Sequence, residues 1–491
     1  MFTFFRIPFL LFFACTLWLP IIVLAQQGSP ADLPTPLPLA SLPLTDAGNM
    51  QKVIVSEIIL EGNRITRKSI IMREMLFYQG DSLTLNALHR AMAESRENLL
   101  NTAFFNFVEM YICLEELPQV RVSIHFVERW YIWPFPILEI GDRNINEWLS
   151  NPSAERLNYG FYLVWDNFRG GGDRVDLLLK SGYRQLYTLS YSKPYFNRAK
   201  TLGWSLETGI SRTREIAFTT IANRQQFVET PDEFIYRNYY ISASINYRPG
   251  MRNFHSFRLG YEYFAFADTL LALNPSYSPA GRTILGFLSA HWGFKHDFRD
   301  LKAYPLKGHY FDVRLSRYGL GLLKNETMGL TTLESSFRRY LEISKRWHFA
   351  AGLNAKFSQG RRDVYFRQQG LGFKGDLVRG YEKYVIDGQH FLVFKSNLKY
   401  SLIPQRSKRI GFLPGERFGL IHYALYLNLF ADAGYIDDRY FYTGNHLNNT
   451  LLAGFGLGLD FVTYYDKVFR TELSMNRQGE IGLFFHIIAP I

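Results

Sequence analysis

The sequence has only two cysteines, Cys15 and Cys113, in 491 residues. Cys15 lies in an N-terminal apolar segment that we expect to be removed, so one cysteine remains and no internal disulfide can form. Beyond that segment no stretch of about 18 uncharged apolar residues occurs, which excludes a membrane-spanning helix there. The mean hydropathy of −0.11 is also too polar for a helical membrane protein of this size.

Motifs of common enzyme classes are also missing. There is no G-x-S-x-G elbow, no H-E-x-x-H motif and no P-loop, and the eleven histidines show no ligand spacing. The glycines at 454, 456 and 458 lie in a strand pattern and open no helix, so they do not indicate a dinucleotide site. We therefore predict that the protein is not an enzyme and has no cofactor and no obligate metal.

The net charge of +11 does not point to nucleic acid either. The basic residues are scattered, and many alternate with apolar residues. This pattern is typical of a polar lumen or of contact with phosphate-bearing lipid headgroups, so we predict no nucleic-acid partner.

What the sequence does contain is an alternation of apolar and polar residues that continues to its end. Residues 187–192 read Tyr-Thr-Leu-Ser-Tyr-Ser, and residues 469–476 read Phe-Arg-Thr-Glu-Leu-Ser-Met-Asn. Successive strand residues point to opposite faces, so each segment has one apolar and one polar face. Aromatic residues make up 16% of the chain and crowd the apolar face. The pattern is typical of a closed barrel in lipid, apolar outside and polar within.

Residues 1–25 are expected to be a secretory signal peptide. The apolar segment Ile7–Leu24 follows a basic residue and ends at a small-residue cleavage site. A membrane anchor helix is the alternative, but Pro8 and Pro20 favour removal. Residues 26–50, rich in Pro, Ser and Ala, predict a flexible linker.

Residues 51–130 predict a small α+β domain. We expect a strand over Val53–Leu60, helices over Arg67–Phe77 and Leu83–Leu100, and strands over Phe107–Cys113 and Val120–Val127. Four segments in this order, IILEGNRITRKSIIMREM, YQGDSL, FFNFVEMYI and VSIHFVERW, resemble a POTRA domain. Each segment alone is weakly diagnostic, but the ordered set is specific, and we expect a single such domain.

Residues 131–491 predict an all-β transmembrane barrel of about 16 antiparallel strands, an even number as bacterial single-chain barrels require. About ten residues suffice for one tilted strand to cross the bilayer. The expected strand centres are Leu138, Leu163, Leu178, Leu189, Leu206, Ile241, Leu259, Leu288, Leu315, Leu333, Leu353, Leu398, Leu427, Leu457, Leu473 and Phe485.

One long segment, Gly360–Gln389, does not alternate. It contains Val378-Arg379-Gly380-Tyr381 between the eleventh and twelfth expected strands. There it resembles the sixth-loop motif of the BamA/TamA superfamily of outer-membrane assembly factors. The resemblance implies that the loop folds into the barrel and that its arginine docks on the inner wall.

The strand Ile421–Phe430 offers a partner for Arg379. Its parity directs Asn428, Phe430 and Asp432 into the lumen, and Phe430–Gly434 (FADAG) is similar to the F-x-D-x-G motif of the superfamily. We therefore predict that Arg379 pairs with Asp432. The alternative is that Arg379 is a surface loop residue and that Asp432 only ends a strand.

The next strand supports this prediction. Its inward positions are Gly454, Gly456, Gly458 and Asp460. Glycine in a strand often marks the close approach of another backbone, here the loop containing Gly375–Tyr381. Asp460 is expected to be a second acceptor for Arg379, whose guanidinium fork suits carboxylates in a partly dehydrated lumen.

A seam is expected between the first strand near Leu138 and the last strand, Ile481–Ile488. The outward residues of that last strand are Ile481, Leu483, Phe485 and Ile487. The chain departs from the aromatic C-terminus common in such barrels, and Pro490 cannot donate to a sheet. The resemblance implies that a weak seam acts as a lateral gate.

The resemblance, which covers most of residues 53–491, implies a protein of the Gram-negative outer membrane with its POTRA domain in the periplasm. It would bind unfolded clients by strand addition and template their insertion into the lipid, with accessory lipoproteins or periplasmic chaperones as further partners. Two alternatives remain: a two-partner-secretion translocation pore and a diffusion porin. The clients themselves are not revealed by the sequence.

Overall fold

The computed structural model describes residues 37–38, 52–114, 117–140, 156–360, 365–367, 369–372, 376–409, 420–439, 444–463 and 467–487. The predicted signal peptide and most of the predicted linker lie outside these residues. Of the linker, Leu37–Pro38 form a two-residue strand, β1, which pairs with β4 (Phe105–Leu114). The chain forms two units, which are described in turn.

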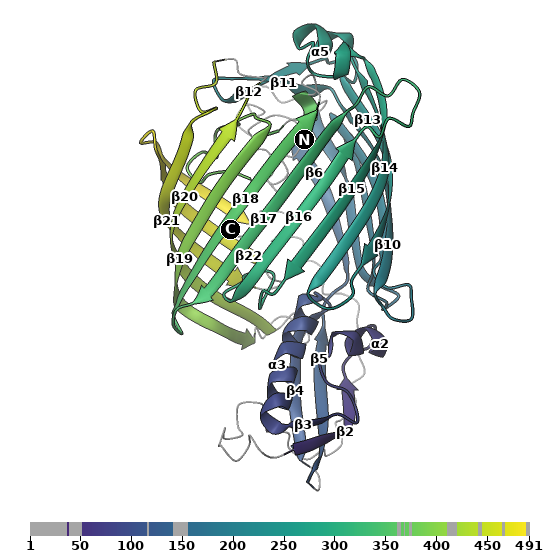
Figure 1. The fold of residues 1–491 in the computed structure, drawn as a ribbon, viewed down its shortest axis with the longest axis vertical. Helices are drawn as coiled ribbons and strands as arrows, with labels where there is room; N and C mark the ends of the chain where they lie inside the picture. The colour runs from purple at the N-terminus through teal and green to yellow at the C-terminus, as the bar shows by residue number, and fades with distance from the viewer. Residues whose placement is uncertain are drawn as a thin grey trace. The chain divides into compact units, whose positions relative to one another are not determined.

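The small domain is a five-stranded sheet with the strand order β1-β4-β5-β2-β3 (Figure 1). Strands β2 (Lys52–Glu61) and β5 (Gln119–Glu128) run parallel, whereas β2 with β3 (Ser82–Thr84) and β4 with β5 run antiparallel. Helix α3 (Leu85–Asn101) packs Leu88, Met92 and Leu99 into the core of this domain. The predicted order of strand, helix, helix, strand and strand is present, but Ser82–Thr84 form the additional strand β3, so the second helix begins at Leu85 and not at Leu83.

The first helix of this domain is shorter than predicted. Helix α2 (Lys68–Ile71) continues as the 3₁₀ turn η2 (Met72–Glu74), and the chain is already extended at Met75. Met75 and Phe77 are both fully buried. Alternate residues of an extended segment share one face, so these two side chains reach the core without a longer helix.

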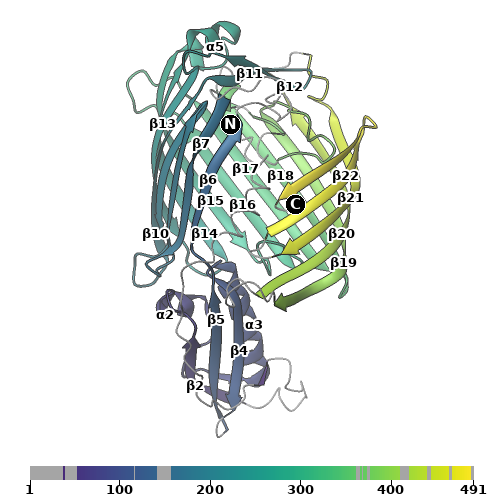
Figure 2. The same ribbon diagram turned by 180° about the vertical axis from the view of Figure 1, so that it is seen from behind.

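The second unit is one sheet of sixteen strands (Figures 1 and 2). Among the described residues, no helix combines the length and the apolar character that crossing a bilayer requires. Each of the sixteen predicted strand centres falls within a different strand of this sheet, so the predicted even number of strands is confirmed. The strands are β6 (Ile132–Ile140), β7 (Leu157–Phe168), β8 (Asp173–Gly182), β9 (Arg184–Lys193), β10 (Leu202–Thr213), β13 (Tyr236–Tyr247), β14 (Asn253–Phe266), β15 (Ile284–Asp297), β16 (Gly308–Tyr318), β17 (Leu330–Glu342), β18 (Trp347–Gly360), β19 (His390–Arg409), β20 (Leu420–Asp437), β21 (Leu451–Thr463), β22 (Lys467–Asn476) and β23 (Ile481–Ile487).

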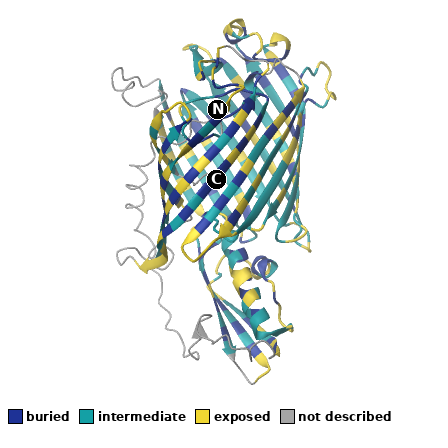
Figure 3. Cartoon of the chain, turned by 60° about the vertical axis from the view of Figure 1, so that its left-hand side comes forward, coloured by how far each residue is buried: buried dark blue, intermediate teal, exposed yellow. Residues whose placement is uncertain are grey.

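The strands alternate in exposure as they alternate in sequence (Figure 3). On β22, Arg470 and Glu472 are buried whereas Leu473 is half exposed. The exposed positions of the wall carry large apolar side chains, among them Phe455, Leu457 and Phe485. An apolar outer face and a polar inner face are the arrangement that a bilayer imposes on a barrel, since lipid offers no partner to polar groups.

The connections at one end of the barrel carry their own structure. Between β10 and β13 lies a hairpin of β11 (Glu215–Ile221) and β12 (Arg224–Glu229). The remaining short elements are helix α5 (Asp268–Leu273) and the 3₁₀ turns η4 (Pro279–Gly281) and η5 (Tyr365–Arg367). Residues of α5 and η5 share an apolar cluster with Phe264 and Phe287 of the barrel wall.

The sheet order begins with β23 and ends with β6. Within the described residues, β6 pairs with β7 and β23 pairs with β22, and no register joins β6 to β23. With seven residues, β23 is also the shortest of the sixteen strands.

Candidate functional site in the barrel lumen

The segment that precedes β19 is held against the inner face of the barrel. Val378 and Tyr381 pack with Val393 of β19 and with Ile436 and Leu452 of the neighbouring strands. This apolar contact positions Arg379, one of the two residues between them, which is completely buried.

The Arg379 side chain forms a two-point contact with Asp432. Its Nε donates to Oδ2 at 2.8 Å and its Nη2 donates to Oδ1 at 2.5 Å. The backbone N–H of Arg379 also donates to Oδ2, at 3.2 Å. The planar guanidinium fork matches a carboxylate in this geometry, which fixes orientation as well as charge. The structure therefore places these two residues together as the sequence predicts.

The remaining donors of Arg379 are also used. Nη1 donates to Asn397 Oδ1 at 2.8 Å and to Glu472 Oε1 at 3.2 Å, and Nη2 donates to the Ser396 carbonyl at 3.2 Å. All five N–H groups of the guanidinium thus have an acceptor. Full satisfaction is what makes a completely buried arginine tolerable, because an unpaired buried charge is costly.

The F-x-D-x-G motif acts as a unit around this arginine. The Phe430 ring lies under the guanidinium, with its centroid 3.9 Å from Cζ, in cation–π contact. Asp432 supplies the charge. A Cβ on Gly434 would lie 2.5 Å from Cγ2 of Val378, so the glycine leaves room for the residue before the arginine.

Two backbone features fix the turn at Gly380. Its φ is +93°, a conformation that favours glycine, and a Cβ there would lie 3.1 Å from Cβ of Asn476. Asn476 donates to the Gly380 carbonyl at 3.1 Å. The loop is thereby joined to β22 as well as to β20.

Only one of the three inward glycines of β21 admits the loop backbone. A Cβ on Gly454 would lie 1.8 Å from the Arg379 carbonyl oxygen. A Cβ on Gly456 would instead meet the Leu473 carbonyl and the Phe430 ring, and one on Gly458 would meet the Glu472 side chain at 3.2 Å. The expectation that all three make way for the loop is therefore corrected to Gly454 alone.

The prediction that Asp460 is a second acceptor for Arg379 is wrong. Both oxygens of Asp460 accept from Arg470, at 2.6 Å each, and Tyr304 Oη donates to Oδ2 at 2.7 Å. Asp460 stands six residues along β21 from Gly454, about 20 Å at the rise of a strand. The second carboxylate at Arg379 is Glu472, which pairs across the sheet with Gly458.

A second set of contacts, which the sequence did not indicate, closes the loops over one another. Asn223, at the tip of the β11–β12 hairpin, is fully buried and has a φ of +57°. Its backbone N–H donates to Asn445 at 2.9 Å, its side-chain amide donates to Asn448 at 2.8 Å, and its side-chain oxygen accepts from Leu447 N at 3.0 Å. Its carbonyl accepts from Val385 N at 3.0 Å. These four hydrogen bonds link the hairpin to two other loops, and no spacing in the sequence predicts them.

The residues predicted for the seam are found on the two end strands of the sheet. Leu138 on β6 is 60% exposed, and Phe485 on β23 is 73% exposed. Ile481 and Leu483 are also exposed, and Ile487 is opposite Phe469 at the end of the register between β22 and β23. Their role as a gate stays a prediction.

Comparison with known proteins places these features in a family context. A POTRA model described as surface antigen variable number repeat matches residues 53–129, and a model described as Omp85 superfamily domain matches residues 167–395. A search of curated proteins found no match.

Several solved structures are similar to this chain. BamA from Haemophilus ducreyi lacking POTRA domains 1–3 is 15% identical, with 89% of this chain and 84% of that chain covered and a TM-score of 0.47. CdiB from Escherichia coli is 13% identical, with 92% of each chain covered and a TM-score of 0.44. CdiB from Acinetobacter baumannii is 11% identical, with 89% and 73% covered and a TM-score of 0.44.

Proposed function

The chain belongs to the Omp85 superfamily and carries a POTRA domain, and from this premise we propose that it inserts client β-barrel proteins into the outer membrane. Its barrel lies in the outer membrane and its POTRA domain in the periplasm. Members of the family are transporters or assembly factors, so the role is in membrane insertion or translocation of client proteins. Insertion, rather than translocation, is the finer statement that we propose.

The proposal rests on the two strands at the ends of the barrel sheet, β6 and β23. Strands β6 and β23 each have one partner strand within the described residues, and β23 is short. An edge strand offers unpaired N–H and C=O groups to another chain. A client hairpin that pairs there satisfies its backbone before its apolar face enters the lipid, where an unpaired backbone group costs several kcal/mol.

The POTRA domain offers a second edge for client capture. Within the described residues, the register of β4 with β1 covers Tyr111 and Ile112 of the ten residues of β4. An extended client segment that continues this pairing would add a strand to the sheet, with main-chain hydrogen bonds supplying affinity. Glu109, an exposed residue of β4, is a suitable position for a photo-crosslinker.

Depletion of the protein followed by quantitative outer-membrane proteomics tests the function. Loss of many barrel proteins is the expected result. Loss of one exported protein would favour translocation, and a permeability defect with unchanged barrel proteins would favour a porin; either result contradicts the proposal.

A tether tests the seam directly. Cysteines at Leu138 and Leu483, in a Cys113→Ser background, are bridged by a bismaleimide, which is expected to abolish client insertion. The matched control bridges Leu457 and Leu473, which are partners in the register of β21 with β22 and therefore do not separate when the seam opens. Full activity of the seam-tethered protein would rule out lateral opening.

A further inference from the structure

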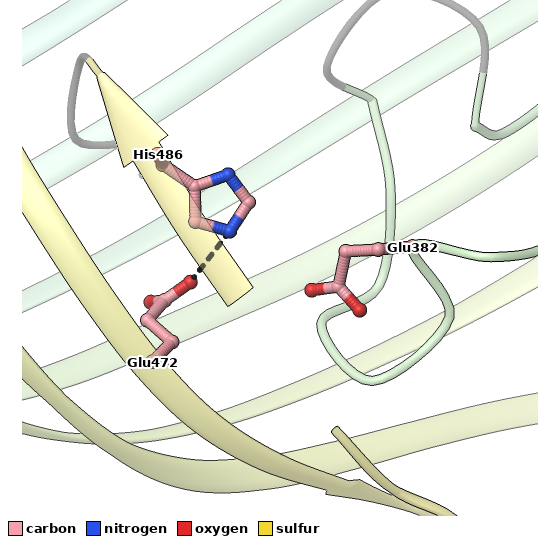
Figure 4. A group of neighbouring side chains, drawn as sticks. All are labelled: Glu382, Glu472 and His486. Carbon is pink, nitrogen blue, oxygen red and sulfur yellow. Dashed lines mark ion pairs between the residues drawn. The ribbon is translucent and has the colours of Figure 1, made fainter. Parts of the chain in front are cut away.

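Three ligand-type side chains converge between the loop and the last strand. Glu382 follows the Arg379 turn, Glu472 lies on β22 and His486 lies on β23, and one ligand atom of each lies within 4.8 Å of the others (Figure 4). Glu382 is 90 positions from Glu472 in the sequence, and Glu472 and His486 lie on neighbouring strands, so no ligand spacing in the sequence indicates the three together.

Their hydrogen bonding leaves one side of each group unused. Glu472 Oε1 accepts from Arg379 and lies 3.5 Å from Nη1 of Arg470, whereas its buried Oε2 has no hydrogen-bond donor among the described residues. Glu382 Oε2 accepts from Gly380 N at 2.9 Å, and its Oε1 is likewise buried without a donor in the described part of the chain.

His486 turns its Nε2 toward this pair of oxygens. Nε2 lies 3.2 Å from Glu472 Oε2 and has no aligned hydrogen bond within the described residues. Figure 4 shows the Glu382 carboxylate facing the other two side chains across the gap. The Glu472 side chain is 0% exposed. Three atoms of ligand type thus face one another, and the most deeply buried of them, Glu472 Oε2, has only the 3.2 Å ion-pair contact with His486 among the described residues.

We propose that Glu382, Glu472 and His486 bind a divalent transition-metal ion, with Zn²⁺ as the best-fitting example. Zn²⁺ binds two carboxylates and an imidazole readily. Ca²⁺ and Mg²⁺ prefer oxygen ligands, so the imidazole argues against them. Tetrahedral Zn²⁺ holds such atoms about 3.3 Å apart, so a small rotation of the Glu382 side chain completes the set. Solvent or a client group takes the fourth position.

The bound ion links two parts of the molecule that matter for the seam. Glu382 belongs to the loop held by Arg379, and His486 belongs to β23, at the end of the sheet. The ion fastens the edge strand to the docked loop, and because it binds only the folded barrel it stabilises that state. This proposal stands whether the protein inserts clients or translocates them.

Zn²⁺ titration of the tag-free, chelator-treated full chain in detergent tests the site. We expect one Zn²⁺ per chain by calorimetry and a higher temperature for loss of the compact band on electrophoresis. His486→Asn and Glu382→Gln are expected to weaken binding by on the order of tenfold or more and to remove the Zn²⁺-dependent rise in that temperature.

Two matched variants control for other histidines and carboxylates. His446→Asn changes an exposed loop histidine, and Glu480→Gln changes a carboxylate that bonds Tyr384 and Asn476; both should bind Zn²⁺ as the wild type does. If wild type and His486→Asn bind Zn²⁺ equally, or if neither binds it, the cluster does not hold the ion and the proposal is overturned.

Discussion

Arg379 and Asp432 form a buried two-point ion pair across 53 positions of the sequence, with Nε–Oδ2 and Nη2–Oδ1 distances of 2.8 and 2.5 Å. The pair holds the loop to β20, in addition to the apolar packing of Val378 and Tyr381 and the Asn476–Gly380 hydrogen bond. The guanidinium of Arg379 has further contacts. The Phe430 ring covers one of its faces, and Asn397 and Glu472 accept hydrogen bonds from its Nη1.

Removal of the arginine is expected to be strongly destabilising. Arg379→Ala leaves Asp432 buried without its cation, at a cost of about 3–5 kcal/mol. We expect reduced barrel levels and loss of the heat-modifiable compact form on electrophoresis. Arg439→Ala, at an exposed position, is the control. Normal barrel levels and full activity of Arg379→Ala would contradict the role of the pair.

A double-mutant cycle should distinguish the two acidic residues. Arg379→Ala and Asp432→Ala are expected to be non-additive in unfolding free energy, with a coupling of about 1–3 kcal/mol. Arg379→Ala and Asp460→Ala should be nearly additive, because Asp460 is bound to Arg470 and Tyr304. Urea unfolding in lipid vesicles provides the measurement. Equal coupling in the two cycles would restore Asp460 as a partner of Arg379.

The glycines of β21 should respond differently to the same methyl group. Gly454→Ala would place Cβ 1.8 Å from the Arg379 carbonyl, and neither backbone can yield without displacing the loop. We expect a loss of about 1–3 kcal/mol and greater protease sensitivity at residues 376–389. Gly458→Ala would place Cβ 3.2 Å from Cγ of Glu472, a milder contact with a side chain rather than with backbone, and should cost less than Gly454→Ala. Equal sensitivity of the two variants would show that the loop does not rest on Gly454.

The hairpin tip offers a test of loop closure. Asn223→Gly keeps the positive φ but removes the side-chain bonds to Asn448 and Leu447, at about 1–3 kcal/mol for the buried groups left unpaired. We expect cells to admit large antibiotics that the wild-type strain excludes. Asn325→Gly is the control, an exposed loop asparagine with a φ of +67°. Unchanged antibiotic sensitivity would mean that the hairpin does not close the barrel.

The stability of the folded barrel should depend on pH through Asp387. Burial raises the pKa of this loop carboxyl from 3.8 to about 7, and the nearby Asp438 charge raises it as well. The folded state therefore holds the proton more tightly than the unfolded state, so this contribution to stability is complete below about pH 4 and lost as the pH rises through 7. Asp387→Asn should stabilise the barrel at pH 8, by on the order of 4 kcal/mol, and leave it unchanged at pH 3.

Unfolding temperatures of wild type and Asp387→Asn across this range provide the measurement. A stability difference that does not vary between pH 3 and pH 8 would show that the carboxyl titrates normally.

The strand pattern was predictable because a bilayer enforces strict alternation. Each predicted centre lies in its strand, and parity alone put Phe430 and Asp432 on the inner face. The first helix of the small domain was predicted too long, because Met75 and Phe77 fit a helical face nearly as well as an extended one. The loop contacts of Asn223 were not predictable, since they join segments that only the closed barrel brings together.

The alternation in the amino-acid sequence determined which residues of β20 and β21 face inward, and the resemblance of FADAG and the loop arginine to superfamily motifs predicted the pairing of Arg379 with Asp432. Only the tertiary structure decided which inward side chains lie at the same height along the barrel and contact one another. Arg470 pairs with Asp460, Glu472 pairs with Arg379, and His486 lies against Glu472. Alternation has a period of two and specifies only the side of the sheet. Height along the barrel depends on the register between strands and on the path of the loop, which form only when the whole sheet pairs.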